Sequence, residues 1–144
     1  LAKLGVDEHT LPVLHLAPLL QVAWADGDVQ PAERTLLEDA AADLPLPDEA
    51  RAMFEKYLHQ RPSKRFFDGA LTFLQLTLAA RSEAEADAEI ASLGEAAMRI
   101  AEATGGLFGL FGNVDADEKD VLREIAQRLE SVQPDAAREL LAKL

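Results

Sequence analysis

Three carboxylate side chains gather around a glycine in the segment 24–33, WADGDVQPAE. Asp26, Asp28 and Glu33 fall within eight residues, where an apolar segment gives way to an amphipathic one. Carboxylate oxygens are the ligands that the hard cations Ca²⁺ and Mg²⁺ prefer. Three carboxylates fill only part of a shell of about six to eight oxygens, so the segment predicts a weak cation site, with a dissociation constant of roughly 0.1–1 mM. The spacing is not that of an EF-hand loop.

The same residues also fit a purely structural corner between two helices. Gly27 suits a turn that needs a left-handed conformation, and Pro31 suits a first helical turn. Gln30 as N-cap with Glu33 three residues later has the spacing of a capping box. This interpretation leaves Asp26 unexplained, because a carboxylate at the end of the preceding helix would face the negative end of its dipole. The structural corner and the cation site therefore both stay open.

A weaker second copy of the corner occurs later in the chain. The segment 112–119, GNVDADEK, aligns with 27–34, GDVQPAER, so that Glu118 corresponds to Glu33. Asp115 and Glu118 again have capping-box spacing. Because each copy precedes an amphipathic segment, the repeat predicts a pseudo-symmetric pair of helical hairpins.

Helix-favouring residues dominate the chain, and no segment alternates with the period of a strand. We expect one all-α domain spanning 1–144, a bundle of about seven helices with two pseudo-repeated helical hairpins. The first and fourth helices are apolar nearly all round, which predicts two central helices wrapped by five amphipathic ones. Pro18 should kink or restart the first helix. The predicted helices are 11–25, 31–44, 48–60, 64–81, 83–104, 116–131 and 134–143.

Composition restricts the classes of partner and chemistry. Fourteen basic and 26 acidic residues give a net charge of −12, which disfavours nucleic acid and anionic lipid surfaces. The chain has no cysteine, hence no disulfide or thiolate site, and this composition suits the cytoplasm. No apolar run reaches the roughly 18 residues of a membrane span. The chain begins at Leu1 rather than at a methionine, so we expect flanking segments outside it.

The segment 105–112, GGLFGLFG, alternates glycine with large apolar residues. It lacks the Gly-Lys-Ser/Thr sequence that holds phosphates. We expect a loop that tucks Leu107, Phe108 and Phe111 under the bundle. The alternative is an exposed apolar tip that docks a protein or associates peripherally with a membrane.

The run Ala25-Asp26-Gly27-Asp28-Val29 followed by Glu33 resembles the Ala-Asp-Gly…Glu signature of the TerB-like (tellurite-resistance TerB) family. The second copy and the seven-helix pattern extend the resemblance over nearly the whole chain. It implies an all-α fold, a role in tellurite resistance and stress response, and binding of calcium or another divalent metal.

The resemblance also implies a ligand set. Asp26, Asp28 and Glu33 are the implied metal ligands, and Glu118 is the residue of the second copy that carries over. Asn113 stands in place of Asp28 and Phe111 in place of Asp26, which argues against a second complete site. Related domains occur as modules beside chaperone or membrane partners.

Residues for catalysis are lacking. His9, His15 and His59 are scattered, and no serine or threonine lies in a nucleophile motif. A hydrolase using carboxylate-held Mg²⁺ would need a base and a substrate site that no motif supplies. We therefore expect a non-enzymatic, cytoplasmic TerB-like domain with a weak Ca²⁺ or Mg²⁺ site and a protein partner. The alternative is a metal-independent interaction module of a larger protein.

Overall fold

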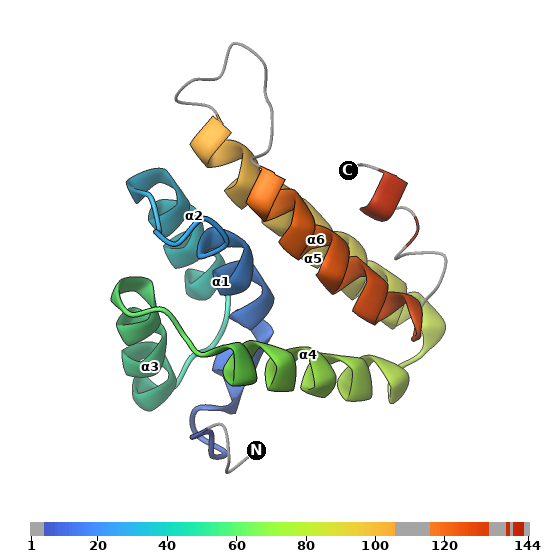
Figure 1. Ribbon diagram of the computed structural model, residues 1–144. Coiled ribbons are helices and arrows are strands. Elements are labelled where there is room, and N and C mark those ends of the chain that lie inside the picture. Colours follow the sequence, from blue (N-terminus) through green and yellow to red (C-terminus); the bar gives the residue numbers. More distant parts are fainter. Residues whose placement is uncertain (1–4, 106–115, 133–137, 139, 143–144) are drawn as a thin grey trace.

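The chain folds into helices only, within the part that the structure describes. The computed structural model describes residues 5–105, 116–132, 138 and 140–142. Those residues contain no strand, which confirms the predicted all-α class. The predicted helix 134–143 lies mostly outside them, although 140–142 are helical. The elements are η2 (Leu11–His15, a 3₁₀ helix), α1 (Ala17–Ala23), α2 (Pro31–Ala42), α3 (Asp48–His59), α4 (Lys64–Ala79), α5 (Glu83–Gly105) and α6 (Ala116–Glu130) (Figure 1).

The first predicted helix, 11–25, is two helices rather than one. The chain forms η2, passes through Leu16 and starts again as α1, which places Pro18 in the first turn of the new helix. Proline is tolerated there because the amide at that position has no intrahelical acceptor. The predicted restart at Pro18 is thus confirmed. The predicted end at Ala25 is wrong, because α1 ends at Ala23.

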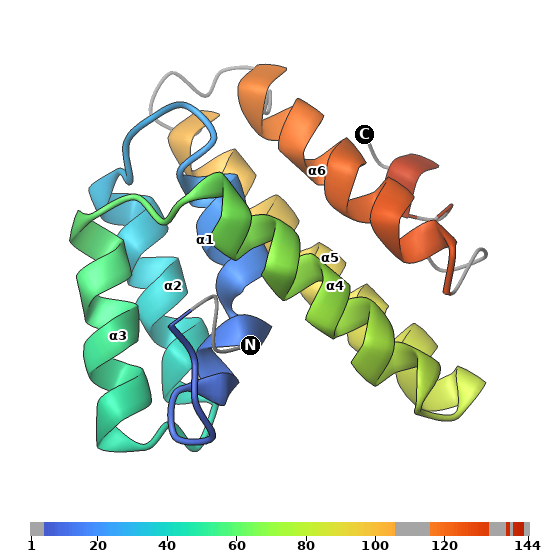
Figure 2. The same cartoon turned by 60° about the horizontal axis from the view of Figure 1, so that its bottom comes forward.

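Helix α1 lies at the centre of the bundle. All seven of its residues are buried, and it contacts α2, α4, α5 and α6 (Figures 1 and 2). Each large apolar side chain buried in this way contributes roughly 1.5–3 kcal/mol to the gross folding free energy. The prediction of a central first helix is confirmed for this part of it.

Helix α4 is not a second central helix, contrary to expectation. One side of it is buried through Phe66, Phe67, Leu71, Leu74 and Leu78. Leu76 on its other side is 68% exposed. The reason is position, since α4 runs along an edge of the bundle and packs toward α1 and α6 only from its inner side (Figure 2).

Side-chain caps fix where several helices begin. The hydroxyl of Ser63 accepts the backbone N–H of Phe66 at 3.1 Å, which caps α4. Ser82 caps α5 in the same way, accepting the N–H of Glu85 at 3.2 Å. Each cap joins residues only three apart, so it is set by the local sequence.

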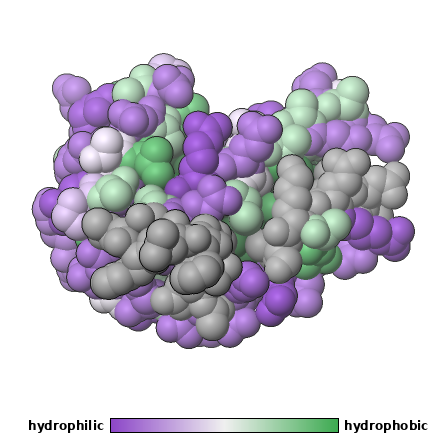
Figure 3. All heavy atoms as spheres, turned by 90° about the horizontal axis from the view of Figure 1, so that it is seen from above, coloured by the Kyte–Doolittle hydropathy of each residue, from purple (hydrophilic) through white to green (hydrophobic). Residues whose placement is uncertain are grey.

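Polar side chains cover much of the outer surface. Figure 3 shows one face on which hydrophilic residues predominate and hydrophobic ones form smaller patches between them. None of the described helices is long and apolar enough to cross a membrane.

Candidate functional site: an acidic corner and the α2–α5 groove

The corner between α1 and α2 is a tight turn. The N–H of Gly27 donates to the carbonyl of Trp24 at 2.9 Å, and Gly27 has a φ of 91°. A side chain is disfavoured at that φ, so glycine is needed for backbone reasons alone. The predicted left-handed turn is confirmed.

Glu33 has a structural place in this corner. Its side chain is fully buried, and its Oε1 accepts the backbone N–H of Gln30 at 2.9 Å, as in a capping box. Val29 beside it is 4% exposed, and Pro31 is the first residue of α2. The predicted helix start is therefore confirmed residue by residue.

Asp26 also has a local partner. Its Oδ1 accepts the backbone N–H of Asp28 at 3.3 Å, a contact of the kind that aspartate makes two residues ahead in turns. Asp26 is half-buried, while Asp28 is exposed. The sequence predicts that Asp26 lies at the end of the first helix. This prediction is wrong, because α1 ends at Ala23, three residues before Asp26. The turn contact gives Asp26 a role that does not depend on a cation.

The second copy repeats the burial of its glutamate. Glu118 is fully buried like Glu33, and these are the only charged side chains buried among the described residues. Asp117 is exposed. Residues 106–115, which include Asp115 and all of the glycine-rich segment after Gly105, lie outside the described part, and so do the predictions made for them.

The described carboxylates do not form a complete metal site by themselves. No group of three or more histidine, aspartate or glutamate side chains stands close enough to hold a metal within the ranges that the structure describes. Asp26 and Asp28 share the turn, whereas one oxygen of Glu33 is taken by the Gln30 amide. The described residues thus show no preassembled cluster of ligands, and a cation site at Asp26, Asp28, Glu33 and Glu118 stays a prediction.

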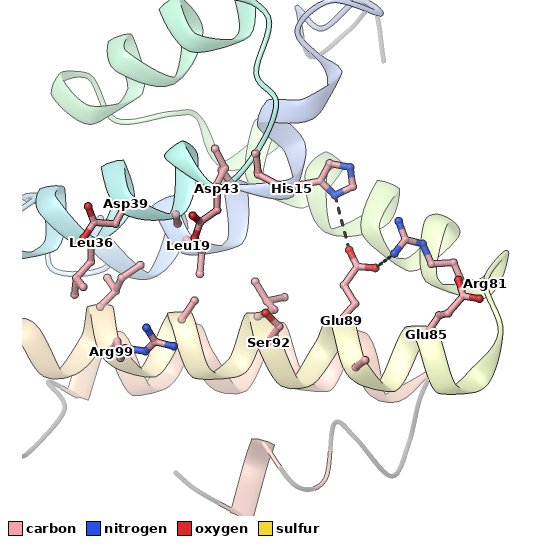
Figure 4. A pocket seen from close by; sticks show the side chains of 17 residues that line it. His15, Leu19, Leu36, Asp39, Asp43, Arg81, Glu85, Glu89, Ser92 and Arg99 are labelled. Atoms are coloured by element: carbon pink, nitrogen blue, oxygen red, sulfur yellow. Dashed lines mark hydrogen bonds and ion pairs between the residues drawn. The ribbon is translucent and has the colours of Figure 1, made fainter.

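One hollow in the described surface is a feature that sequence reasoning missed. It is a groove of about 850 Å³ walled on one side by α2 and on the other by α5, here called the α2–α5 groove (Figure 4). Its lining residues on α5 recur every three or four positions, which is the repeat of one helix face. The lining comprises His15, Leu16, Leu19, Leu36, Asp39, Ala40, Asp43, Leu44, Arg81, Glu85, Ala88, Glu89, Ser92, Leu93, Ala96, Arg99 and Ile100.

The groove has an apolar floor. Leu16, Leu19 and Ile100 are buried beneath it, while Leu36 and Leu93 are only partly buried at its walls. Partly covered leucines on two facing helices leave apolar surface that a further apolar group could cover.

Charged side chains form the rim. Asp39 on α2 and Asp43 at its C-cap stand one helical turn apart, and Arg99 lies on the α5 side (Figure 4). Asp39, Asp43 and Glu85 are exposed and make no ion pair with another described residue. Arg99 instead lies 3.9 Å from Glu95, measured from Nη2 to Oε2.

A cluster around Glu89 lies toward one end of the groove. Its carboxylate pairs with Arg81 and lies 3.9 Å from Nδ1 of His15 (Figure 4). The edge of the His15 ring also meets Phe73, with ring centroids 6.1 Å apart. Of the four acidic residues in 83–89, Glu83 and Glu85 are exposed, whereas Asp87 and Glu89 are partly buried.

A sequence signal for the groove exists, but it is weak. Leu36, Ala40 and Leu44 on one side and Leu93 and Ala96 on the other have helical spacing, which by itself indicates only a core-facing stripe. Whether the two helices cover each other's stripes depends on the distance between α2 and α5. That separation is set by packing at the floor and not by either stripe.

The resemblance to the TerB-like family rests on the corner motif and its second copy, and it remains a prediction. Comparison of the chain with protein-family models, with curated proteins and with solved structures gives no match.

Proposed function

We propose that this chain is a non-catalytic protein-interaction domain whose binding site is the α2–α5 groove. The observation that carries the proposal is an elongated hollow with an apolar floor and a charged rim, open between two helices. Binding surfaces of proteins combine an apolar centre with a polar rim in the same way. The corner then serves to fix the angle at which α2 leaves α1, and so the wall of the groove. A cysteine-free chain suits action in the cytoplasm.

Two alanines on α5 allow a test with a matched control. Ala88 lines the groove, whereas Ala91 is also exposed but is not among the residues that line it. Peptides would be selected on the intact domain from a display library of random 18-residue sequences. Ala88→Trp fills the groove and is expected to abolish binding of the selected peptides, while Ala91→Trp leaves it unchanged. Circular dichroism melts check that both variants fold.

The outcome that overturns this proposal is equally direct. If the selected peptides bind Ala88→Trp and the wild type alike, the groove is not the binding site. Ser92→Trp fills the groove from a second position on the same wall. It serves as a check in case the peptides still bind beside the tryptophan at position 88.

A second candidate function is weak binding of a divalent cation at the corner, with the stress-response role that the TerB-like resemblance implies. The observation that favours it is that Asp26 and Asp28 share one turn, directly before the helix on which Glu33 lies. In this proposal Asp26 and Asp28 complete the ligand set from the turn.

Titration of Ca²⁺ and Mg²⁺ into chelator-treated protein tests this candidate. A cation at about 100 times its dissociation constant should stabilise the fold by roughly 2.7 kcal/mol. The double variant Asp26→Asn/Asp28→Asn should remove the shift, and Glu38→Gln/Glu55→Gln, at exposed sites away from the corner, should retain it. A melting temperature that does not move at millimolar metal contradicts the candidate.

A further inference from the structure

The shape of the groove selects among classes of ligand. Its lining on α5 runs from Glu85 to Ile100, which at 1.5 Å per residue is about 22 Å of helix. A small molecule would cover only part of such a length. An α-helix of about four turns would cover all of it, with the apolar residues of one face seated between Leu36 and Leu93.

The charges of the rim select the chemistry of that helix. Four carboxylates line the groove against two guanidinium groups, and one of the two, Arg81, is already paired with Glu89. Asp39 on α2 and Asp43 at its C-cap are exposed and unpaired among the described residues, and their i, i+4 spacing places both on the same side of the groove. A helix seated there meets negative charge along its α2 flank. Its α5 flank meets Ser92 and Arg99, while Glu85 and the Arg81-paired Glu89 lie nearer the start of α5 (Figure 4).

We infer that the occupant of the α2–α5 groove is an amphipathic helix of a partner protein that carries lysine or arginine along the flank facing Asp39 and Asp43. This inference rests on the proposed function and adds the chemical class of the partner. A second copy of this chain is a poor occupant, because each copy carries a net charge of −12 and the two would repel. An anionic lipid surface is disfavoured on the same ground.

The test uses a second display library, in which 18-residue peptides have leucine, isoleucine or alanine at i, i+3, i+4 and i+7 repeats. The remaining positions are drawn equally from lysine, arginine, glutamate, glutamine and serine. Selection on the intact domain should enrich lysine and arginine on one flank of the apolar stripe. Binding of the enriched peptides should fall when sodium chloride rises from 0.05 to 0.5 M, because surface charge pairs are screened.

Variants of the domain separate a local effect from the overall negative charge. Asp39→Asn/Asp43→Asn should weaken the enriched peptides by about threefold to tenfold, the effect of losing two exposed charge pairs. Glu38→Gln/Glu55→Gln removes the same charge from exposed positions outside the groove and should weaken them by less than twofold. Circular dichroism melts check the folding of both variants.

Failure of the inference is distinct from failure of the proposed function. Peptides that lose binding to Ala88→Trp but carry no excess of lysine or arginine overturn the inference and leave the groove as the site. Equal effects of the two charge-neutralising variants also overturn it. Self-association of the domain that Ala88→Trp abolishes would identify a second copy as the occupant and overturn it as well.

Discussion

The indole N–H of Trp24 donates to the backbone carbonyl of Tyr57 at 2.8 Å, which joins the end of α1 to α3. Trp24 itself is 7% exposed. The contact links Trp24, the residue just before the corner, to α3, more than 30 residues later in the sequence. The orientation of the corner is therefore held by α3 as well as by the hydrogen bonds of the turn itself.

Trp24→Phe should lower the free energy of unfolding by about 1–3 kcal/mol, because the Tyr57 carbonyl loses its donor in a part-buried place. Urea denaturation followed by circular dichroism measures the change. Tyr57→Phe is the control, since it removes the hydroxyl but keeps the accepting carbonyl. A cost below about 0.5 kcal/mol for Trp24→Phe would contradict the structural role of the bond.

Substitutions at Glu33 can separate the stability effect of its capping hydrogen bond from that of its negative charge. Glu33→Gln keeps an oxygen that can accept the Gln30 N–H, whereas Glu33→Ala leaves that amide unsatisfied and should cost about 1–2 kcal/mol more. Urea denaturation in the presence of a chelator measures both variants without any contribution from metal. Equal costs for the two would show that the carboxylate charge, and not the capping bond, matters to the fold.

The two faces of α4 should respond differently to the same substitution. Leu71 is fully buried, so Leu71→Ala should cost about 2–5 kcal/mol. Leu76 is 68% exposed, so Leu76→Ala should change stability by no more than about 0.5 kcal/mol. Thermal melts of the pair measure this contrast. A large cost at Leu76 would mean that this side of α4 is covered in solution.

Stability on the acid side should depend on Asp7. Its Oδ1 accepts the N–H groups of His9 and Thr10, and the Thr10 N–H contributes most to holding the pKa of Asp7 below its ordinary value of 3.8. Because the folded pKa is depressed, the stabilisation is present above the ordinary pKa and is lost as pH falls through the folded pKa.

The difference in stability between the wild type and Asp7→Asn should therefore narrow as pH falls from 6 toward 3. Carboxyl carbon NMR titration gives the pKa of Asp7 directly, and urea denaturation at both pH values gives the stability difference. A pKa at or above 3.8 would show that the turn contacts do not hold in solution.

Local features of this fold could be predicted from the sequence, because their causes lie within a few residues. Gln30 with Glu33, Ser63, Ser82 and the restart at Pro18 all depend on hydrogen bonds or steric limits that act over at most one helical turn. The left-handed conformation of Gly27 could be predicted for the same reason, because it is required by the local turn.

Features set by packing between distant segments could not be predicted. The apolar composition of α4 indicated a central helix, but an edge position leaves Leu76 exposed. The role of Asp26 depended on where α1 ends, and a shift of two residues moved its carboxylate from a helix end to a turn. The α2–α5 groove depends on the separation of two helices whose sequences are more than 40 residues apart.

The central position of α1 has a consequence for synthesis of the chain. Its seven residues leave the ribosome early, yet they pack against α4, α5 and α6, the last of which begins at Ala116. At about 5–20 residues per second, the roughly 100 residues between them take on the order of 5–20 s to appear. During that interval α1 lacks the cover that α6 provides in the folded domain. Complete packing around α1 is thus a late event, and until then part of its apolar surface is open to chaperones.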